Sequence, residues 1–264
     1  MESTVTVLPP SPWDSLKQSE WPESLTALAT SITKRHEQRE MACALKRGLE
    51  DVRSGFTHLC LRGHQSLTTV VGAASTDPEL ASFFRVLQEP TSKLRLVPVL
   101  LRVLKGENTG EMILDSDENE AERRARSGAA AEQSPVTEEE QEAAALLLQG
   151  VCLVHPASRT VAAHMGAVET LLGRVVQCTS LATRAALLDC LLTLQLGTHG
   201  WPAVAAMRRT RGVRTVGALL ARSRDAPEAR RHAAEFLLLL LRHVAPPPEA
   251  PAEAGAEAGP AGAG

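Results

Sequence analysis

An internal repeat in the second half of the chain limits the possible folds more than any other feature of the sequence. Residues 150–168 correspond to residues 193–213, at a spacing of roughly 43 to 45 residues, and the four-residue segment VAAH at 161–164 aligns with VAAM at 204–207. A period in the low forties with two or three helices in each unit is typical of armadillo and HEAT repeats. The repeat therefore indicates stacked helical units.

Each repeat unit has the pattern of a long apolar helix, a short helix and a third, amphipathic helix. In the third helix of the first unit, apolar residues recur at helical spacing, namely Val168, Leu171, Leu172, Val175 and Val176. The long helices, around 146–154 and 187–196, are apolar on almost every side, as expected of helices that lie between neighbours. Stacking buries faces that a single unit leaves exposed. We expect an all-α fold, an armadillo/HEAT-like helical repeat stack over residues 137–244.

The composition agrees with an all-α fold. Aromatic residues make up 3% of the 264 residues and tyrosine is absent, whereas β-sandwiches and barrels rely on aromatic and β-branched side chains. Leucine, alanine and arginine, which favour helices, are abundant instead.

Residues 13–105 are expected to form an N-terminal helical part. Apolar residues recur at helical spacing in two stretches, first Trp21, Leu25, Leu28 and Ile32, and then Met41, Leu45, Val52, Phe56 and Leu59. The sequence Asp77-Pro78-Glu79 predicts a helix start, because Asp caps helices, Pro suits the first turn and Glu favours the positive end of the dipole. A further helix is predicted over 97–104.

Three segments lack the apolar residues of a core. Residues 1–12 and 245–264 are predicted to be a flexible N-terminus and a disordered Pro/Ala/Gly tail, and residues 106–136 a disordered acidic loop that proteases cut first. After this loop, Thr137 with Glu140 matches a capping box that starts a helix. Charge is unevenly spread: residues 115–142 sum to −7 and residues 207–231 to +6, against −3 for the chain.

The cysteine count and the apolar runs predict a cytoplasmic, soluble protein. Five cysteines without regular spacing are not typical of a disulfide framework. The N-terminus has no apolar core of a secretory signal, and the longest apolar run, 236–241, is too short to cross a membrane.

No catalytic, metal or cofactor motif stands out, so we expect a protein without enzymatic activity, cofactor or small-molecule substrate. Cys152 and His155 have the spacing of two metal ligands but lack partners, and a core cysteine beside a helix-end histidine is the simpler interpretation. Cys178 and Arg184 have the spacing of a cysteine phosphatase loop. The residues between them lack glycine and join two helices, so a phosphatase is kept only as an unfavoured alternative.

Arginines concentrate near the C-terminal end and predict a basic face for an acidic or phosphorylated partner. The set comprises Arg208, Arg209, Arg211, Arg214, Arg222, Arg224, Arg230 and Arg231. The alternative is an ordinary solvated surface, because the chain uses 23 arginines and only 5 lysines. Aromatic residues do not alternate with these arginines, which argues against nucleic-acid binding. Ser116 and Ser134 are possible phosphorylation sites in the acidic loop.

Several short segments resemble one protein family. Asp77-Pro78-Glu79-Leu80 with Phe83, Phe84 and Leu87-Gln88-Glu89 is similar to an N-terminal segment of the cell division control protein 14 family of the fungal septation initiation network, which is distinct from the phosphatase of the same name. Leu146-Leu147-Leu148-Gln149-Gly150 leading to His155-Pro156-Ala157-Ser158-Arg159, and Glu235-Phe236-Leu237 near the end, also resemble this family. The resemblance covers most of residues 40–244.

The sequence departs from the family pattern at two places. Pro90-Thr91-Ser92 replaces the usual Gly-Phe-Glu-Trp, and leucines replace aromatic residues in the last helix.

The resemblance implies an armadillo-like scaffold that binds a germinal-centre-type (sterile-20-like) protein kinase at the spindle pole body and acts in septation and cytokinesis. The predicted partner-binding residues are His155, Pro156, Ser158 and Arg159, with a second set at Asp77, Phe83, Phe84 and Gln88. A general armadillo-like adaptor that uses the arginine face for acidic partners remains the alternative.

Overall fold

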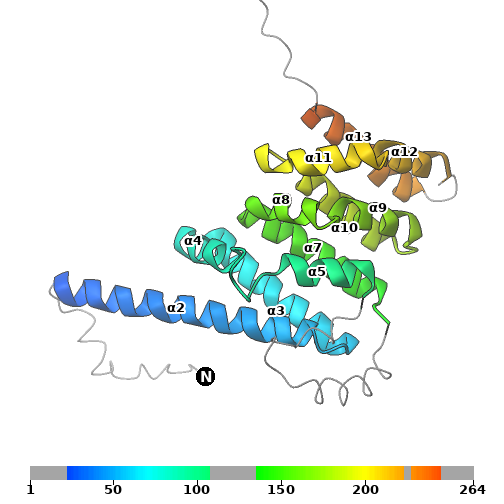
Figure 1. Cartoon of the computed structure of the whole chain (residues 1–264). Coiled ribbons are helices and arrows are strands. Elements are labelled where there is room, and N and C mark those ends of the chain that lie inside the picture. Colours follow the sequence, from blue (N-terminus) through cyan, green and yellow to red (C-terminus); the bar gives the residue numbers. More distant parts are fainter. Residues whose placement is uncertain (1–22, 108–134, 223–226, 245–264) are drawn as a thin grey trace, which may run out of the picture.

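The computed structural model describes residues 23–107, 135–222 and 227–244, and within these ranges the chain is all-helical. Eleven α-helices and one short 3-10 helix account for the regular structure, and the described residues form no strand (Figure 1). The predicted all-α fold is thus confirmed. No described helix combines the length and the apolar character needed to cross a membrane.

Helices α2 (Glu23–Val52) and α3 (Thr57–Thr76) form the first layer and pack closely against each other. A Cβ atom on Gly63 would lie 2.7 Å from the carbonyl oxygen of Gly48, so only glycine allows the two backbones to approach this closely. The turn between the helices passes through Gly55, whose φ of 78° favours glycine.

Most of the two predicted N-terminal stretches lies in one continuous helix, α2, whereas Leu59 belongs to α3 and Trp21 lies outside the described residues. Met41, Leu45 and Val52 are buried on α2, but Phe56 lies in the turn and is 49% exposed, so it does not continue their face. Near the start of α2 the apolar residues Leu25, Leu28 and Ile32 are exposed, because this part of the helix extends beyond the other helices (Figure 1). The periodicity predicted the helix correctly but not which part of it packs.

Helices α4 (Pro78–Leu87) and α5 (Val97–Lys105) begin where the sequence predicted. A side-chain oxygen of Asp77 accepts hydrogen bonds from the backbone N–H groups of Glu79 at 2.7 Å and Leu80 at 3.3 Å. Pro98 lies in the first turn of α5, where its missing N–H costs no hydrogen bond.

Helix α7 (Glu138–Val154) begins with the predicted capping box. The Glu140 side chain accepts a hydrogen bond from the Thr137 N–H at 2.6 Å, and the Thr137 hydroxyl accepts one from the Glu140 N–H at 3.2 Å. Two shorter helices, α8 (Ala157–His164) and α9 (Ala167–Gln177), then lead to the longer α10 (Leu181–Leu194).

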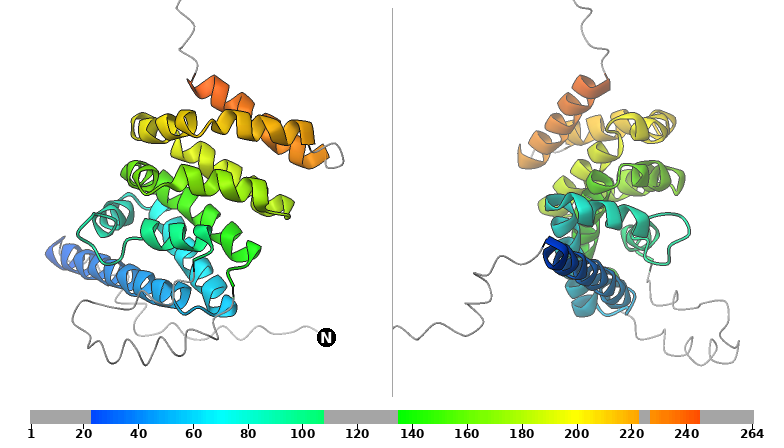
Figure 2. Two further views of the ribbon diagram at one scale, coloured as in Figure 1. Left: turned by 45° about the vertical axis from the view of Figure 1, so that its right-hand side comes forward. Right: turned by 90° about the vertical axis from the view of Figure 1, so that its left-hand side faces the viewer.

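The same order recurs in the last part of the chain. A 3-10 turn, η3 (Thr198–Gly200), precedes the short helices α11 (Trp201–Arg209) and α12 (Gly212–Arg222), and the longer α13 (Pro227–Val244) follows. The long helices contact one another in chain order, α3 with α7, α7 with α10 and α10 with α13. The result is a series of tiers from α2 and α3 at one end to α11, α12 and α13 at the other (Figure 2).

The core runs through these tiers. On α7 and α10, the side chains of Leu147, Leu148, Leu187 and Leu188 are at most 1% exposed, as predicted for helices that lie between neighbours. A fully buried leucine of this kind contributes about 1.5–3 kcal/mol relative to an exposed one. In α9 the first four residues of the predicted apolar face are buried, while Val176 at its edge is 46% exposed.

The predicted flexible segments 1–12 and 245–264, and most of the predicted loop 106–136 with Ser116 and Ser134, lie outside the described residues. The parts on either side of that loop pack together, because α3 and α5 both contact α7, and α5 also contacts α9.

Candidate functional site

The turn between α7 and α8 holds the residues with the strongest predicted role in partner binding. His155 follows the end of α7, and Pro156 directly precedes α8. The His155 ring nitrogen Nδ1 and the Ser158 hydroxyl oxygen are 2.8 Å apart and form a hydrogen bond that fixes the ring over the turn. His155 and Pro156 are half-buried, so both still offer some surface.

Arg159 joins the ends of two long helices instead of facing a partner. Its Nε donates to the carbonyl oxygen of Cys152 in α7 at 3.0 Å, and its Nη1 donates to the carbonyl oxygen of Leu196, just after α10, at 2.8 Å. The side chains of Arg159 and Ser158 are 9% and 3% exposed. The expectation that these two side chains contact a partner is therefore corrected. Arg159 satisfies carbonyl groups near the ends of two helices, and Ser158 bonds to the His155 ring.

Polar and charged side chains from other segments lie close to this turn. Arg85, on α4, is exposed, and its Nε donates to the carbonyl oxygen of Val154 at 3.1 Å. Burial lowers the pKa of His155, and the nearby Arg85 and His199 lower it further, whereas Glu89 raises it. Trp201, two residues after His199, is 67% exposed.

We call this set the corner surface: Arg85, Glu89, His155, His199 and Trp201. It combines residues in and just after α4, the α7–α8 turn, η3 and the first residue of α11. The Arg85 hydrogen bond to Val154 holds α4 at the turn, and η3 contacts both α8 and α11. Because tryptophan and arginine dominate the energetics of many protein interfaces, its composition fits protein binding.

The second predicted binding set has a structural role in most of its members. Asp77 caps α4, and Phe84 is fully buried. Gln88 is 6% exposed and holds the following loop, since its Oε1 accepts from the Leu96 N–H at 2.9 Å and its Nε2 donates to the Leu94 carbonyl at 3.3 Å. Phe83 is partly buried against the core. The expectation that Phe84 and Gln88 contact a partner is therefore also corrected, because both side chains are buried.

The predicted basic face is divided between two places. Arg208, Arg209, Arg211 and Arg214 are exposed around the junction of α11 and α12, and Arg209 forms an ion pair with Glu169 at 2.7 Å. Arg230 and Arg231 are exposed near the start of α13. In the chain, α13 comes after the C-terminal end of α12, a helix about 16 Å long that begins at the first group of arginines. The side chain of Arg222 and all of Arg224 lie outside the described residues.

The geometry around Cys178 opposes the phosphatase alternative. Arg184 donates from Nη2 to the carbonyl oxygen of Cys178 at 2.6 Å, so this arginine serves the helix end and does not face an anion loop. Burial raises the pKa of the Cys178 thiol, although Arg184 opposes this shift. The other pair considered, Cys152 and His155, does not form a metal site among the described residues. Cys152 is fully buried, which raises its pKa to about 12, and the His155 ring bonds to Ser158.

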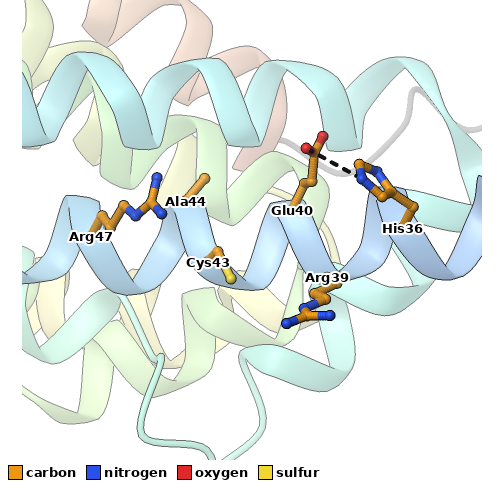
Figure 3. A pocket seen from close by; sticks show the side chains of 6 residues that line it. All are labelled: His36, Arg39, Glu40, Cys43, Ala44 and Arg47. Carbon is orange, nitrogen blue, oxygen red and sulfur yellow. Dashed lines mark ion pairs between the residues drawn. The ribbon is translucent and has the colours of Figure 1, made fainter.

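Among the described residues, those that line a hollow along α2 all belong to this helix, namely His36, Arg39, Glu40, Cys43, Ala44 and Arg47 (Figure 3). The His36 ring nitrogen Nε2 lies 3.8 Å from the Glu40 carboxylate oxygen Oε1, and the two side chains form an ion pair when the histidine is protonated. Figure 3 shows Arg39 and Cys43 pointing away from the side occupied by Glu40 and Arg47. Because the polar groups do not converge on one point, we assign no ligand to this hollow.

Trp201, Arg85 and His199 were missed by the sequence reasoning. Trp201 had a local signal, since Gly200-Trp201-Pro202 marks a helix start with an aromatic residue in the first turn. Arg85 and His199 had none, because only the packing of α4 and η3 against α8 and its flanking turn brings them near His155.

Comparison of the chain with known protein families, with curated proteins and with solved structures finds no match in any of the three.

Proposed function

We propose that this protein is a non-catalytic adaptor with an armadillo-like repeat stack. The observation that carries the proposal is the recurring order of two shorter helices and one longer helix, with the longer helices in contact from α3 to α13. This order agrees with the sequence repeat of roughly 43 to 45 residues. Stacks of this kind serve as extended surfaces for partner proteins.

The partner we propose is a germinal-centre-type (sterile-20-like) protein kinase, with a role in septation and cytokinesis in the cytoplasm and at the spindle pole body. This part rests on the resemblance of the segments around Asp77–Gln88 and His155–Arg159 to the septation family. The buried members of these segments shape the two turns, and the corner surface that they support is the proposed contact. Trp201 and Arg85 are its expected anchors.

A reconstitution with the purified kinase domain tests this proposal. Trp201→Ala should weaken binding at least about tenfold, because a central tryptophan of an interface contributes 2 kcal/mol or more. Val176→Ala removes an exposed apolar side chain on α9 and should leave binding unchanged. If the kinase does not bind the unmodified protein, the kinase assignment is wrong. If both variants bind as tightly as the unmodified protein, the corner surface is not the binding site.

Affinity purification from the native cells then tests the cellular role. A germinal-centre-type kinase recovered in stoichiometric amount supports the septation assignment. Its absence, with another partner enriched, leaves an armadillo-like adaptor and removes the cell-division role.

The exposed arginines favour a second candidate, an adaptor for acidic or phosphorylated partners. Among the described residues, Arg208, Arg211 and Arg214 form no ion pair with a carboxylate, in contrast to Arg209. Binding through this face should weaken strongly as salt is raised and should be lost on replacing Arg208 and Arg211 with glutamate. Binding that responds to Trp201→Ala and only slightly to salt favours the corner surface instead.

A further inference from the structure

The outer side of α13 carries an apolar stripe that the described part of the chain covers only in part, since Ala234 and Leu237 are partly buried whereas Leu238 and Leu241 are exposed. Ala234, Leu237, Leu238 and Leu241 follow the spacing i, i+3, i+4, i+7 and so lie on one side of the helix. Leu238 is 67% exposed and Leu241 65% exposed. The opposite side, with Ala229, Ala233, Phe236 and Leu240, is buried where α13 packs on α10 and α12.

The preceding tier indicates what covers such a stripe. When α13 is aligned with α10 so that their buried positions coincide, Phe236 falls on Cys190 and Leu240 on Leu194. In this register Leu237 and Leu241 correspond to Leu191 and Gln195, which are 0% and 2% exposed.

The same register places exposed Glu235 on exposed Asp189. Burial raises the pKa of Asp189, nearby His232 lowers it and nearby Glu235 raises it, so the two carboxylates lie close to each other. The stripe therefore corresponds to a face of α10 that is buried at Leu191 and Gln195 and partly buried at Leu192, and α13 is the next long helix in contact with α10.

Residues 245–264 of the sequence offer no large apolar side chain for this face, because they consist of alanine, proline, glutamate and glycine. Terminal units of helical stacks ordinarily present a polar outer face. Helix α13 instead exposes Leu238 and Leu241, which another helix packed on this face would bury.

The charges beside the stripe match those of a second copy. Glu235 and Arg242 are both exposed, lie on the same side of the stripe and are two helical turns apart, with Leu238 almost midway between them. An antiparallel pairing with its two-fold axis near Leu238 places Glu235 opposite Arg242 of the second copy, and Arg242 opposite Glu235 of the second copy. A parallel pairing would place like charges together.

The same antiparallel arrangement suits the remaining residues of the face. It places Leu241 over the small side chain of Ala234 of the second copy, and Leu237 beside Leu238 of the second copy. Arg231 lies near the C-terminal end of the opposing helix, where the helix dipole favours a positive charge.

We propose that two copies of this chain associate end to end through the outer face of α13, in an antiparallel helix pair centred on Leu238. The contact involves chiefly one helix from each copy, so it is small for a protein interface and the dimer should form and dissociate with concentration. The resulting particle would present two corner surfaces and bind a partner bivalently.

Sedimentation velocity of the purified full chain over a concentration series tests this inference. The expected result is a reversible shift from one chain of 28.2 kDa toward twice that mass. The double variant Leu238→Glu with Leu241→Glu should remain a monomer at every concentration. Leu153→Glu, which changes a leucine of similar exposure on α7, should dimerise normally.

Charge exchange tests the orientation. Glu235→Arg and Arg242→Glu should each weaken the dimer about tenfold, and the combination of both should restore it, because the opposing charges are then merely exchanged. Circular dichroism verifies that each variant keeps its helix content, as expected for exposed positions. A protein that stays monomeric up to about 100 μM, above the range expected for a specific contact, overturns the inference. A dimer that persists in the double leucine variant also overturns the inference. If the variant with both charges exchanged dimerises more weakly than either single variant, the antiparallel arrangement is wrong.

Discussion

The Nη1 atom of Arg159 lies 2.8 Å from the carbonyl oxygen of Leu196 and so links α8 to the end of α10. The same guanidinium bonds to the carbonyl of Cys152 at the end of α7, and the residue is 9% exposed. One side chain of α8 therefore holds the ends of the two successive long helices α7 and α10 in register.

Replacing Arg159 with alanine should destabilise the fold by about 2–4 kcal/mol, because two carbonyl groups near helix ends lose a charged donor. Urea unfolding followed by circular dichroism measures this change. Arg208→Ala, at an exposed arginine, should stay within about 0.5 kcal/mol of the unmodified protein. Equal stability of both variants would show that the Arg159 contacts contribute little.

A second link across the tiers joins Glu138 to the start of α10. The backbone N–H groups of Thr179 and Ser180 each donate to its carboxylate at 2.8 Å, and these bonds hold the pKa of Glu138 below its ordinary value. A carboxyl group whose pKa is lowered in the fold stabilises the protein above the ordinary pKa of about 4.3, and this contribution is lost as the pH falls through the lowered value.

Glu138→Gln should therefore melt at a lower temperature than the unmodified protein at pH 7, and the difference should shrink toward pH 3. The effect is small, because solvent screens this carboxylate. Thermal melts over a pH series measure it, with Glu139→Gln in the same turn as the control. A constant difference at every pH would mean that the charge is not responsible.

Cysteine reactivity offers a direct test of the packing. Cys43 on α2 is exposed, whereas Cys60, Cys152, Cys178 and Cys190 are buried. Burial raises the pKa of Cys60 and of Cys152 to about 12, so neither is a thiolate near neutral pH. An alkylating reagent at pH 7.5 should modify Cys43 rapidly and the other four only after denaturation, as peptide mapping by mass spectrometry will show. Rapid modification of Cys152 in the native protein would contradict its burial on α7.

Local signals in the sequence predicted the helix starts well. The cap at Asp77 and the capping box of Thr137 and Glu140 depend on neighbouring residues, so spacing alone identified them. The buried leucines of α7 and α10 were predicted because their helices are apolar on almost every side, but Leu146 and Leu153 of α7 are exposed.

The roles of the individual site residues depended on contacts far apart in the chain. Arg159 bonds to a carbonyl 37 residues away, and Arg85 to one 69 residues away, so the sequence could not distinguish a buried brace from a surface charge. The division of the arginine face has a similar cause, because the length of α12 separates residues that are near in sequence. The charge count predicted a basic region but not its geometry.

His64 provides the last prediction, which concerns stability at mildly acidic pH. Its ring is 1% exposed; Nδ1 donates to the carbonyl oxygen of Cys60 at 2.8 Å, and Nε2 has no hydrogen-bond partner among the described residues. Burial lowers its pKa, although the Cys60 carbonyl and nearby Glu140 oppose this shift. The folded protein therefore keeps His64 neutral at a pH where the unfolded chain takes up a proton.

Stability should consequently fall as the pH drops below the unfolded pKa of about 6.5, by at most about 1.4 kcal/mol per pH unit for one proton. His64→Leu removes this titration, so its free energy of unfolding should change less between pH 7 and pH 5, even if its value at pH 7 is lower. Urea unfolding at several pH values measures the slope, and His58→Leu, at an exposed position on the same helix, serves as the control. If the slope of His64→Leu equals that of the unmodified protein, another group causes the loss of stability at acidic pH.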